Sequence, residues 1–100
     1  MLKHIVMWKL LKEAEGGDAL ANARKMKSLL EALRGKVAGM KTLEVGLDIE
    51  RSSTAYDVVL YSEFESKEAL ASYQKHPEHV LAGTFIGKVK ESRVVVDYEV

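Results

Sequence analysis

The sequence predicts a single α+β domain over residues 1–100, with strands and helical regions in the order β-α-β-β-α-β. A length of 100 residues suits one hydrophobic core. Segments with apolar residues at alternate positions predict four strands, and segments with apolar residues three and four apart predict the helices between them. A hydrophobic fraction of 47% and a charged fraction of 30% are typical of globular proteins.

The first predicted strand covers Leu2–Leu10, where β-branched and aromatic residues favour an extended backbone. Both of its faces are apolar, which is typical of a central strand. One face carries His4, Val6 and Trp8, and the other carries Ile5 and Met7.

A helix is predicted from about Ala19 to about Arg34, because Asp18 suits its N-terminal cap and apolar residues then recur at helical spacing. From Thr42 to Glu50, apolar and polar residues alternate strictly. This alternation predicts a half-buried strand at an edge of the sheet.

The third predicted strand, Tyr56–Phe64, is again apolar on both faces. Ser66 suits the cap of a second helix, which should end near His76 because Pro77 disfavours a helical conformation in the residue before it. Residues 78–90 are predicted to be helical or irregular, since two glycines weaken a long helix there. The last strand covers Arg93–Val100.

Two right-handed β-α-β connections, with both helices on one side, give a ferredoxin-like four-stranded antiparallel sheet. The first and third strands are predicted to be central. The helices can cover only one face of this sheet. The uncovered face is predicted to present five apolar side chains: Ile5, Met7, Val59, Tyr61 and Val95.

This open face predicts a homodimer. Burying one such side chain contributes roughly 1.5–3 kcal/mol, so two copies of five contribute about 15–30 kcal/mol as an upper estimate. Association costs on the order of 4–15 kcal/mol, so the gain exceeds the cost. The alternative is a monomer whose open face is solvated by four charged residues: Lys3, Lys9, Asp57 and Glu63.

Composition excludes several other functions. Lys+Arg and Asp+Glu are both 15, so a net charge of zero gives no general attraction to nucleic acid or to an acidic membrane surface. No apolar run approaches membrane-spanning length, and the N-terminus is too polar for a signal peptide. The absence of cysteine excludes thiolate chemistry and is consistent with a cytoplasmic location.

Three histidines and one tyrosine are the candidate functional residues. His4 lies on the helix-facing side of its strand, Tyr73 lies on the inner face of the second helix, and His79 could point back toward Tyr73. A neutral histidine near a phenol supports general acid–base chemistry on a carbonyl compound. Each residue also has a structural explanation: a satisfied core histidine, a core aromatic ring and, for His76, the cap of a new helical turn.

A metal site is not predicted. His76 and His79 are three residues apart, but Pro77 interrupts the helix between them, and zinc needs three or four ligands. No cofactor-binding motif is present either, because the single Gly-Gly pair lacks the further glycines and the lysine of a phosphate-binding loop.

The run Tyr73-Gln74-Lys75-His76-Pro77-Glu78-His79 resembles the stress-responsive A/B barrel (Dabb) family. The resemblance extends over nearly the whole chain, through Lys3–Val6, Tyr56–Leu60, Phe64–Ser66 and Val95–Tyr98. Members of that family are dimeric α+β barrels, so the resemblance implies a homodimer of this kind. One member is a polyketide cyclase in which a tyrosine and a histidine act in a pocket between helices and sheet, with another histidine nearby on the first strand. The matching residues here are Tyr73, His79 and His4.

The resemblance leaves two main functions open. The first is a homodimeric binding or stress-associated domain without catalytic turnover. Its candidate ligand is a small apolar molecule in a pocket lined by His4, Val6, Trp8, Tyr73, His76 and His79. The second is a cofactor-independent enzyme with cyclase- or lyase-like chemistry on a carbonyl or polyketide-like compound. In it, His79 would be the general base, Tyr73 the oxyanion donor and His4 a positioning or proton-sharing group. A cofactor-free monooxygenase, another activity of dimeric α+β barrels, is a third alternative.

Overall fold

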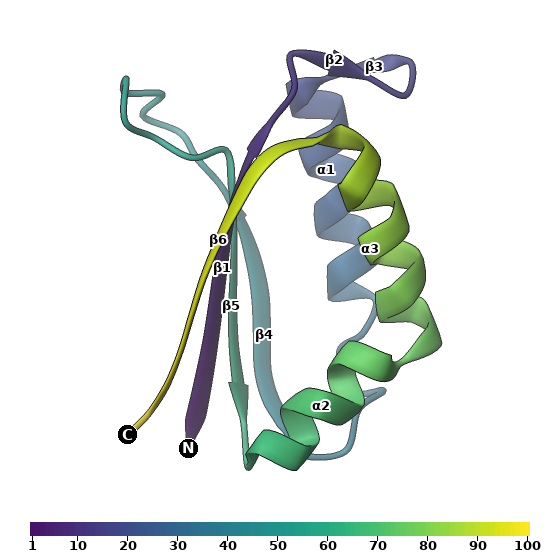
Figure 1. Cartoon of the computed structure of the whole chain (residues 1–100), viewed down its shortest axis with the longest axis vertical. Coiled ribbons are helices and arrows are strands. Elements are labelled where there is room, and N and C mark those ends of the chain that lie inside the picture. The colour runs from purple at the N-terminus through teal and green to yellow at the C-terminus, as the bar shows by residue number, and fades with distance from the viewer.

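The computed structural model describes all 100 residues and arranges them in two layers, an antiparallel sheet and a layer of helices on one of its faces (Figure 1). The strand order is β4-β5-β1-β6. Strands β1 (Leu2–Leu10) and β5 (Val58–Phe64) are central, and β4 (Met40–Leu47) and β6 (Lys90–Glu99) form the edges. The predicted ferredoxin-like fold is therefore confirmed, including its two central strands.

Three helices make up the second layer: α1 (Ala19–Glu31), α2 (Lys67–Lys75) and α3 (Pro77–Val89). The Asp18 carboxylate caps α1 by accepting a hydrogen bond of 2.8 Å from the amide of Ala21. This agrees with the predicted cap, although α1 ends three residues before Arg34. Figure 1 shows α1 and α3 side by side against the sheet, with α2 across the end nearer the two termini.

The region after Pro77 is helical. Residues 78–90, which the sequence left as either helical or irregular, therefore form a helix almost throughout. Pro77 occupies the first turn of α3, where its missing N–H costs nothing. The His76 ring caps this helix, because its Nδ1 accepts a hydrogen bond of 3.1 Å from the amide of Glu78. Burial of Ala82, Ile86 and Val89 on one face of α3 offsets the weak helix propensity of its glycines.

A short hairpin, β2 (Glu13–Ala14) with β3 (Gly17–Asp18), precedes α1 and was not predicted. The side-chain amide of Asn22 ties it to the helix by donating to the carbonyls of Ala14 (2.9 Å) and Gly17 (3.3 Å). The hairpin extends beyond the end of the sheet, at the opposite end of the molecule from α2 (Figure 1).

The register of β6 corrects one prediction. Val95 lies opposite Val6, whereas its two neighbours lie opposite Met7 and Ile5. Directly opposed residues of an antiparallel pair project from the same face. Val95 is therefore on the helix-covered side, and its predicted place on the open face is wrong. The run of three valines, 94–96, fits either alternation and so could not decide the register.

The chain enters the sheet again through a tight turn before β4. Gly39 has a φ of +83°, and a Cβ added there would lie 2.7 Å from the Cβ of Ala69 on α2. The carbonyl of Gly39 also accepts a 2.8 Å hydrogen bond from the amide of Glu65, just before α2. Close backbone approach therefore fixes α2 against the start of β4.

We expect Gly39→Ala to lower the free energy of unfolding by about 3 kcal/mol, because a left-handed backbone and a steric overlap both oppose the methyl group. Gly35→Ala is the matched control, since Gly35 has a φ of +75° but open space around its Cβ position. That control should cost only about 1–2 kcal/mol. Denaturant titration of both variants measures the difference, and equal losses would contradict the packing argument.

Candidate functional site

A cavity of about 140 Å³ lies between the covered face of the sheet and the helices. Five of the six predicted pocket residues line it: His4, Val6, Trp8, Tyr73 and His79. Alternation along β1 projects the first three toward the helices, and α2 and the first turn of α3 contribute the other two. His76 is not part of the lining, since its ring caps α3.

Two hydrogen-bond donors in this cavity are buried without a partner. They are the indole Nε1 of Trp8 and the hydroxyl of Tyr73. An unsatisfied buried polar group costs about 1–3 kcal/mol, and native structures contain few of them. Both groups line the same small cavity, so one bound molecule could satisfy both.

His4 is held by Asp97 on the neighbouring strand. Register places the two residues opposite each other on β1 and β6, and the His4 Nδ1–H donates to the Asp97 carboxylate. His4 is 3% exposed, whereas the Asp97 side chain is 43% exposed. In a neutral imidazole, a proton on Nδ1 leaves Nε2 as a hydrogen-bond acceptor. Asp97 therefore orients His4 within the cavity.

Tyr73 and His79 are in direct ring contact, with centroids 4.5 Å apart and planes at 64°. Burial raises the pKa of the Tyr73 phenol far above its usual range, although the nearby charge of Arg93 opposes this. Burial also lowers the pKa of His79, and the positive charge of Arg93 adds to this effect, whereas a backbone hydrogen bond to Gln74 opposes it. At neutral pH the pair is therefore a protonated phenol beside a neutral imidazole.

Sequence reasoning missed Asp97, the partner of His4, and several residues that line the cavity. Asp97 is 93 residues from His4 in the chain and meets it only through strand pairing. Arg93 was missed because β6 was assigned the opposite alternation. The remaining unpredicted residues come mainly from α1, β5 and α3: Leu30, Leu60, Gly83, Ile86, Gly87 and Lys90.

Comparison with known proteins assigns the family. Residues 2–100 match the family described as the stress responsive A/B barrel domain. The chain belongs to this family. The Dabb resemblance of the sequence motifs is thus confirmed.

Two similar proteins illustrate the relationship. The chain is 35% identical over 80 residues to a stress-response A/B barrel domain-containing protein of Arabidopsis thaliana. That match covers 80% of this chain but only 29% of the Arabidopsis protein, so the chain spans less than a third of that relative. A dimeric protein of unknown function with a ferredoxin-like fold, from Bacteroides fragilis, is 37% identical with a TM-score of 0.87, over 99% of this chain and 95% of the other.

Enzymes share this fold at lower identity. A hydroxynitrile lyase from Passiflora edulis is 16% identical with a TM-score of 0.76, over 99% of this Dabb chain and 92% of the lyase. At this identity the likeness concerns the fold alone.

The open face of the sheet carries four of the five residues predicted for a dimer interface. Ile5 lies opposite Tyr61, and Met7 lies opposite Val59, so these side chains share one face. From β6, the residues on this face are Val94 and Val96 rather than Val95. Met7, Val94 and Val96 are 39%, 40% and 53% exposed, so the face is apolar and accessible.

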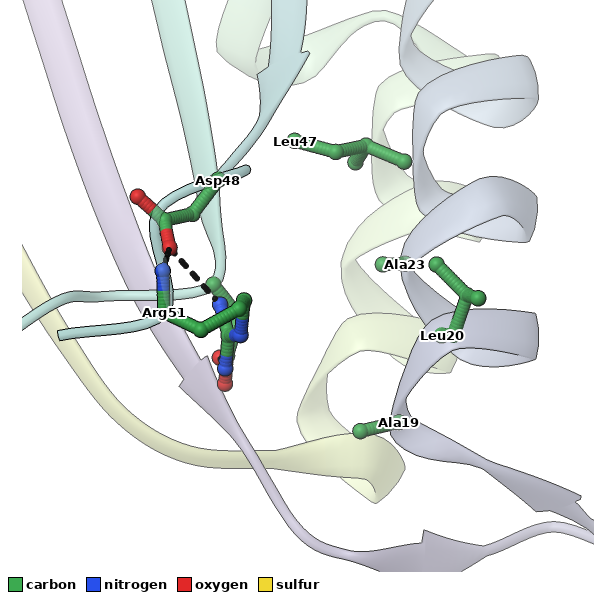
Figure 2. Close-up of a pocket in the computed structure, with 7 residues that line it drawn as sticks. Ala19, Leu20, Ala23, Leu47, Asp48 and Arg51 are labelled. Atoms are coloured by element: carbon green, nitrogen blue, oxygen red, sulfur yellow. Dashed lines mark hydrogen bonds and ion pairs between the residues drawn. The ribbon is translucent and has the colours of Figure 1, made fainter.

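A second cavity, of about 260 Å³, lies between α1 and the loop that follows β4 (Figure 2). Its polar groups are satisfied within the protein. Arg51 bonds to Asp48 at 3.1 Å and to Asp57 at 2.5 Å, and Asp57 also accepts a 2.7 Å hydrogen bond from the amide of Leu10. These bonds anchor the loop to β1. This cavity is larger than the first, but none of its buried donors or acceptors lacks a hydrogen-bond partner.

The structure contains no cluster of three or more histidine, aspartate or glutamate side chains arranged to hold a metal ion. None of its three helices has the length and the apolar run that crossing a bilayer requires.

We expect the free energy of unfolding to fall as the pH is lowered from 7 to 5. The unfolded His79 takes up a proton near pH 6.5, whereas the lowered pKa in the folded state delays protonation, so acid favours unfolding. This group contributes at most about 1.4 kcal/mol per pH unit. Denaturant titrations at several pH values measure the free energy of unfolding. This free energy should depend less steeply on pH in His79→Gln than in the parent.

Carboxylates with a lowered pKa contribute little to the change in stability between pH 7 and pH 5. The pKa values of Glu31, Glu63 and Glu78 are lowered from 4.5 by their hydrogen bonds and ion pairs, so their contribution to stability is lost only at lower pH. Identical slopes for the parent and His79→Gln between pH 7 and 5 would contradict the burial of a neutral His79.

Proposed function

We propose that this Dabb protein binds a small, largely apolar molecule with a hydrogen-bond acceptor in the cavity between helices and sheet. The observation that supports this most directly is the pair of buried, unpartnered donors on Trp8 and Tyr73. An acceptor on the ligand would satisfy both groups and recover the cost of their desolvation. The apolar walls formed by Val6, Leu60 and Ile86 would cover the rest of the molecule.

The volume limits the ligand to about one ring. Apolar cavities of roughly 150 Å³ bind benzene, so about 140 Å³ suits a six-membered ring with few substituents. A larger molecule would have to extend out of the cavity or widen it. The ligand is therefore proposed to be a ring-sized compound.

Cyclohexanone and methylenecyclohexane test the hydrogen bond, because they have the same shape and differ in the acceptor. Trp8 is the only tryptophan, so its indole N–H signal in an NMR titration reports on the cavity alone. We expect cyclohexanone to bind about fivefold to tenfold more tightly and to shift this signal downfield. Tyr73→Phe should remove most of this preference.

Tyr73→Phe is a clean variant because the hydroxyl it removes has no partner, so the free energy of unfolding should not fall. Ser62→Ala is the contrasting control. Its buried hydroxyl donates to the carbonyl of His4 at 2.8 Å, and its loss should cost about 1 kcal/mol. If neither probe binds, or if the ketone has no advantage, the proposed hydrogen-bonded site is wrong.

We also propose that the chain is a homodimer joined through the open face of its sheet. The exposed apolar side chains of β1 and β6 support this proposal. The similar Bacteroides fragilis protein is dimeric, which also supports it. Such an interface would bury side chains from two identical sheets around a two-fold axis.

Sedimentation of two variants tests this assembly. Met7→Glu places a charge on the open face and should shift the protein to the monomer at micromolar concentration. Leu81→Glu places the same charge on the outer side of α3, at a residue that is 67% exposed, and should leave the dimer intact. A parent protein that sediments as a monomer would refute the proposal.

A cofactor-independent acid–base enzyme is the second candidate, supported by the contact between the neutral His79 and the protonated Tyr73. His79 would accept a proton next to a carbonyl group, and Tyr73 would donate to the developing oxyanion. His4, held by Asp97, would position the substrate. Turnover of a panel of β-diketones that is lost in Tyr73→Phe and in His79→Ala would favour this candidate over simple binding.

A further inference from the structure

Two basic residues line the mouth of the cavity, Lys90 and Arg93, and neither forms an ion pair within the chain. Both are exposed, in contrast to the deep wall formed by Val6 and Leu60, which are each 1% exposed. Lys90 follows the last turn of α3, where the helix dipole already favours a cation. Arg93 has no such structural explanation.

The strand register directs Arg93 into the site. It lies opposite Trp8 in the β1–β6 pair, so the two side chains project from the same face as close neighbours. The charge of Arg93 also reaches Tyr73 and His79. It acts to lower the pKa of each, although burial raises the pKa of Tyr73 overall. A positive charge and the unpartnered indole N–H therefore converge from adjacent strands.

The mouth itself is open. Gly83 and Gly87 line it from α3, and a Cβ added at either position would meet no atom within 4 Å. The two glycines therefore place no side chain over this part of the cavity lining. A ligand held at the mouth can therefore reach the guanidinium while its body lies inside.

We propose that the ligand is a small carboxylate with an apolar, ring-sized body, whose carboxylate lies near Arg93. The two buried polar atoms without a partner are both hydrogen-bond donors, and the two unpaired charges of the lining are both positive. A carboxylate is negatively charged and only accepts hydrogen bonds, so it complements both features. The lining contains no acidic residue, and Asp97 beside it is paired with His4. This inference rests on the proposed ligand-binding function.

Benzoate and benzamide test the charge, because they have nearly the same shape and differ in one formal charge. We expect the parent to bind benzoate about tenfold more tightly than benzamide in an NMR titration at low salt, and the preference should shrink at high salt. Arg93→Gln should weaken the binding of benzoate about fivefold to tenfold and leave the affinity for benzamide unchanged. Arg93→Lys should keep part of the preference, because it keeps the charge.

Arg24→Gln is the matched control, since Arg24 is an exposed arginine on α1, outside the lining of the cavity. It should change neither affinity. Equal binding of benzoate and benzamide, or no effect of Arg93→Gln, would overturn the carboxylate proposal. If cyclohexanone still bound in that case, the ligand-binding function would stand. If none of the three compounds bound, both proposals would fall.

Discussion

The helices cover one face of the sheet and leave the other bare, and the rest of the molecule follows from this constraint. Strands β1 and β5 are central and carry apolar side chains on both faces. On the covered side, these side chains meet α1 and α3 and enclose the core and the cavity. On the bare side, Met7, Val94 and Val96 remain exposed as an accessible apolar surface.

The cavity is costly to the fold, which argues for a role in binding. Each unsatisfied donor costs about 1–3 kcal/mol, and each glycine inside α3 costs about 1 kcal/mol relative to alanine. Replacing Tyr73 by phenylalanine or Gly83 by alanine would remove such a cost without any clash. The chain keeps both features beside the same small space, and the cap by His76 with Pro77 stabilises α3 despite its glycines.

Local patterns predicted the elements well, because caps and periodicity act over a few residues. Asp18, Ser66 and His76 cap the three helices as side-chain chemistry suggests. The site was harder to predict, because it depends on pairing between the two ends of the chain. His4 and Trp8 meet Asp97 and Arg93 across the β1–β6 register, and a run of valines left this register undetermined by sequence.

The register has a further consequence, since successive side chains of a strand project to opposite faces. On β6, Val94 and Val96 lie on the bare face, while Arg93, between Ser92 and Val94, lies on the cavity side. A partner packed on the bare face would therefore hold β1 and β6 from behind the cavity. It would limit the motion of an edge strand that otherwise pairs on one side only. Association and ligand binding would then be coupled, because a strand already held in place loses less conformational freedom when the ligand binds.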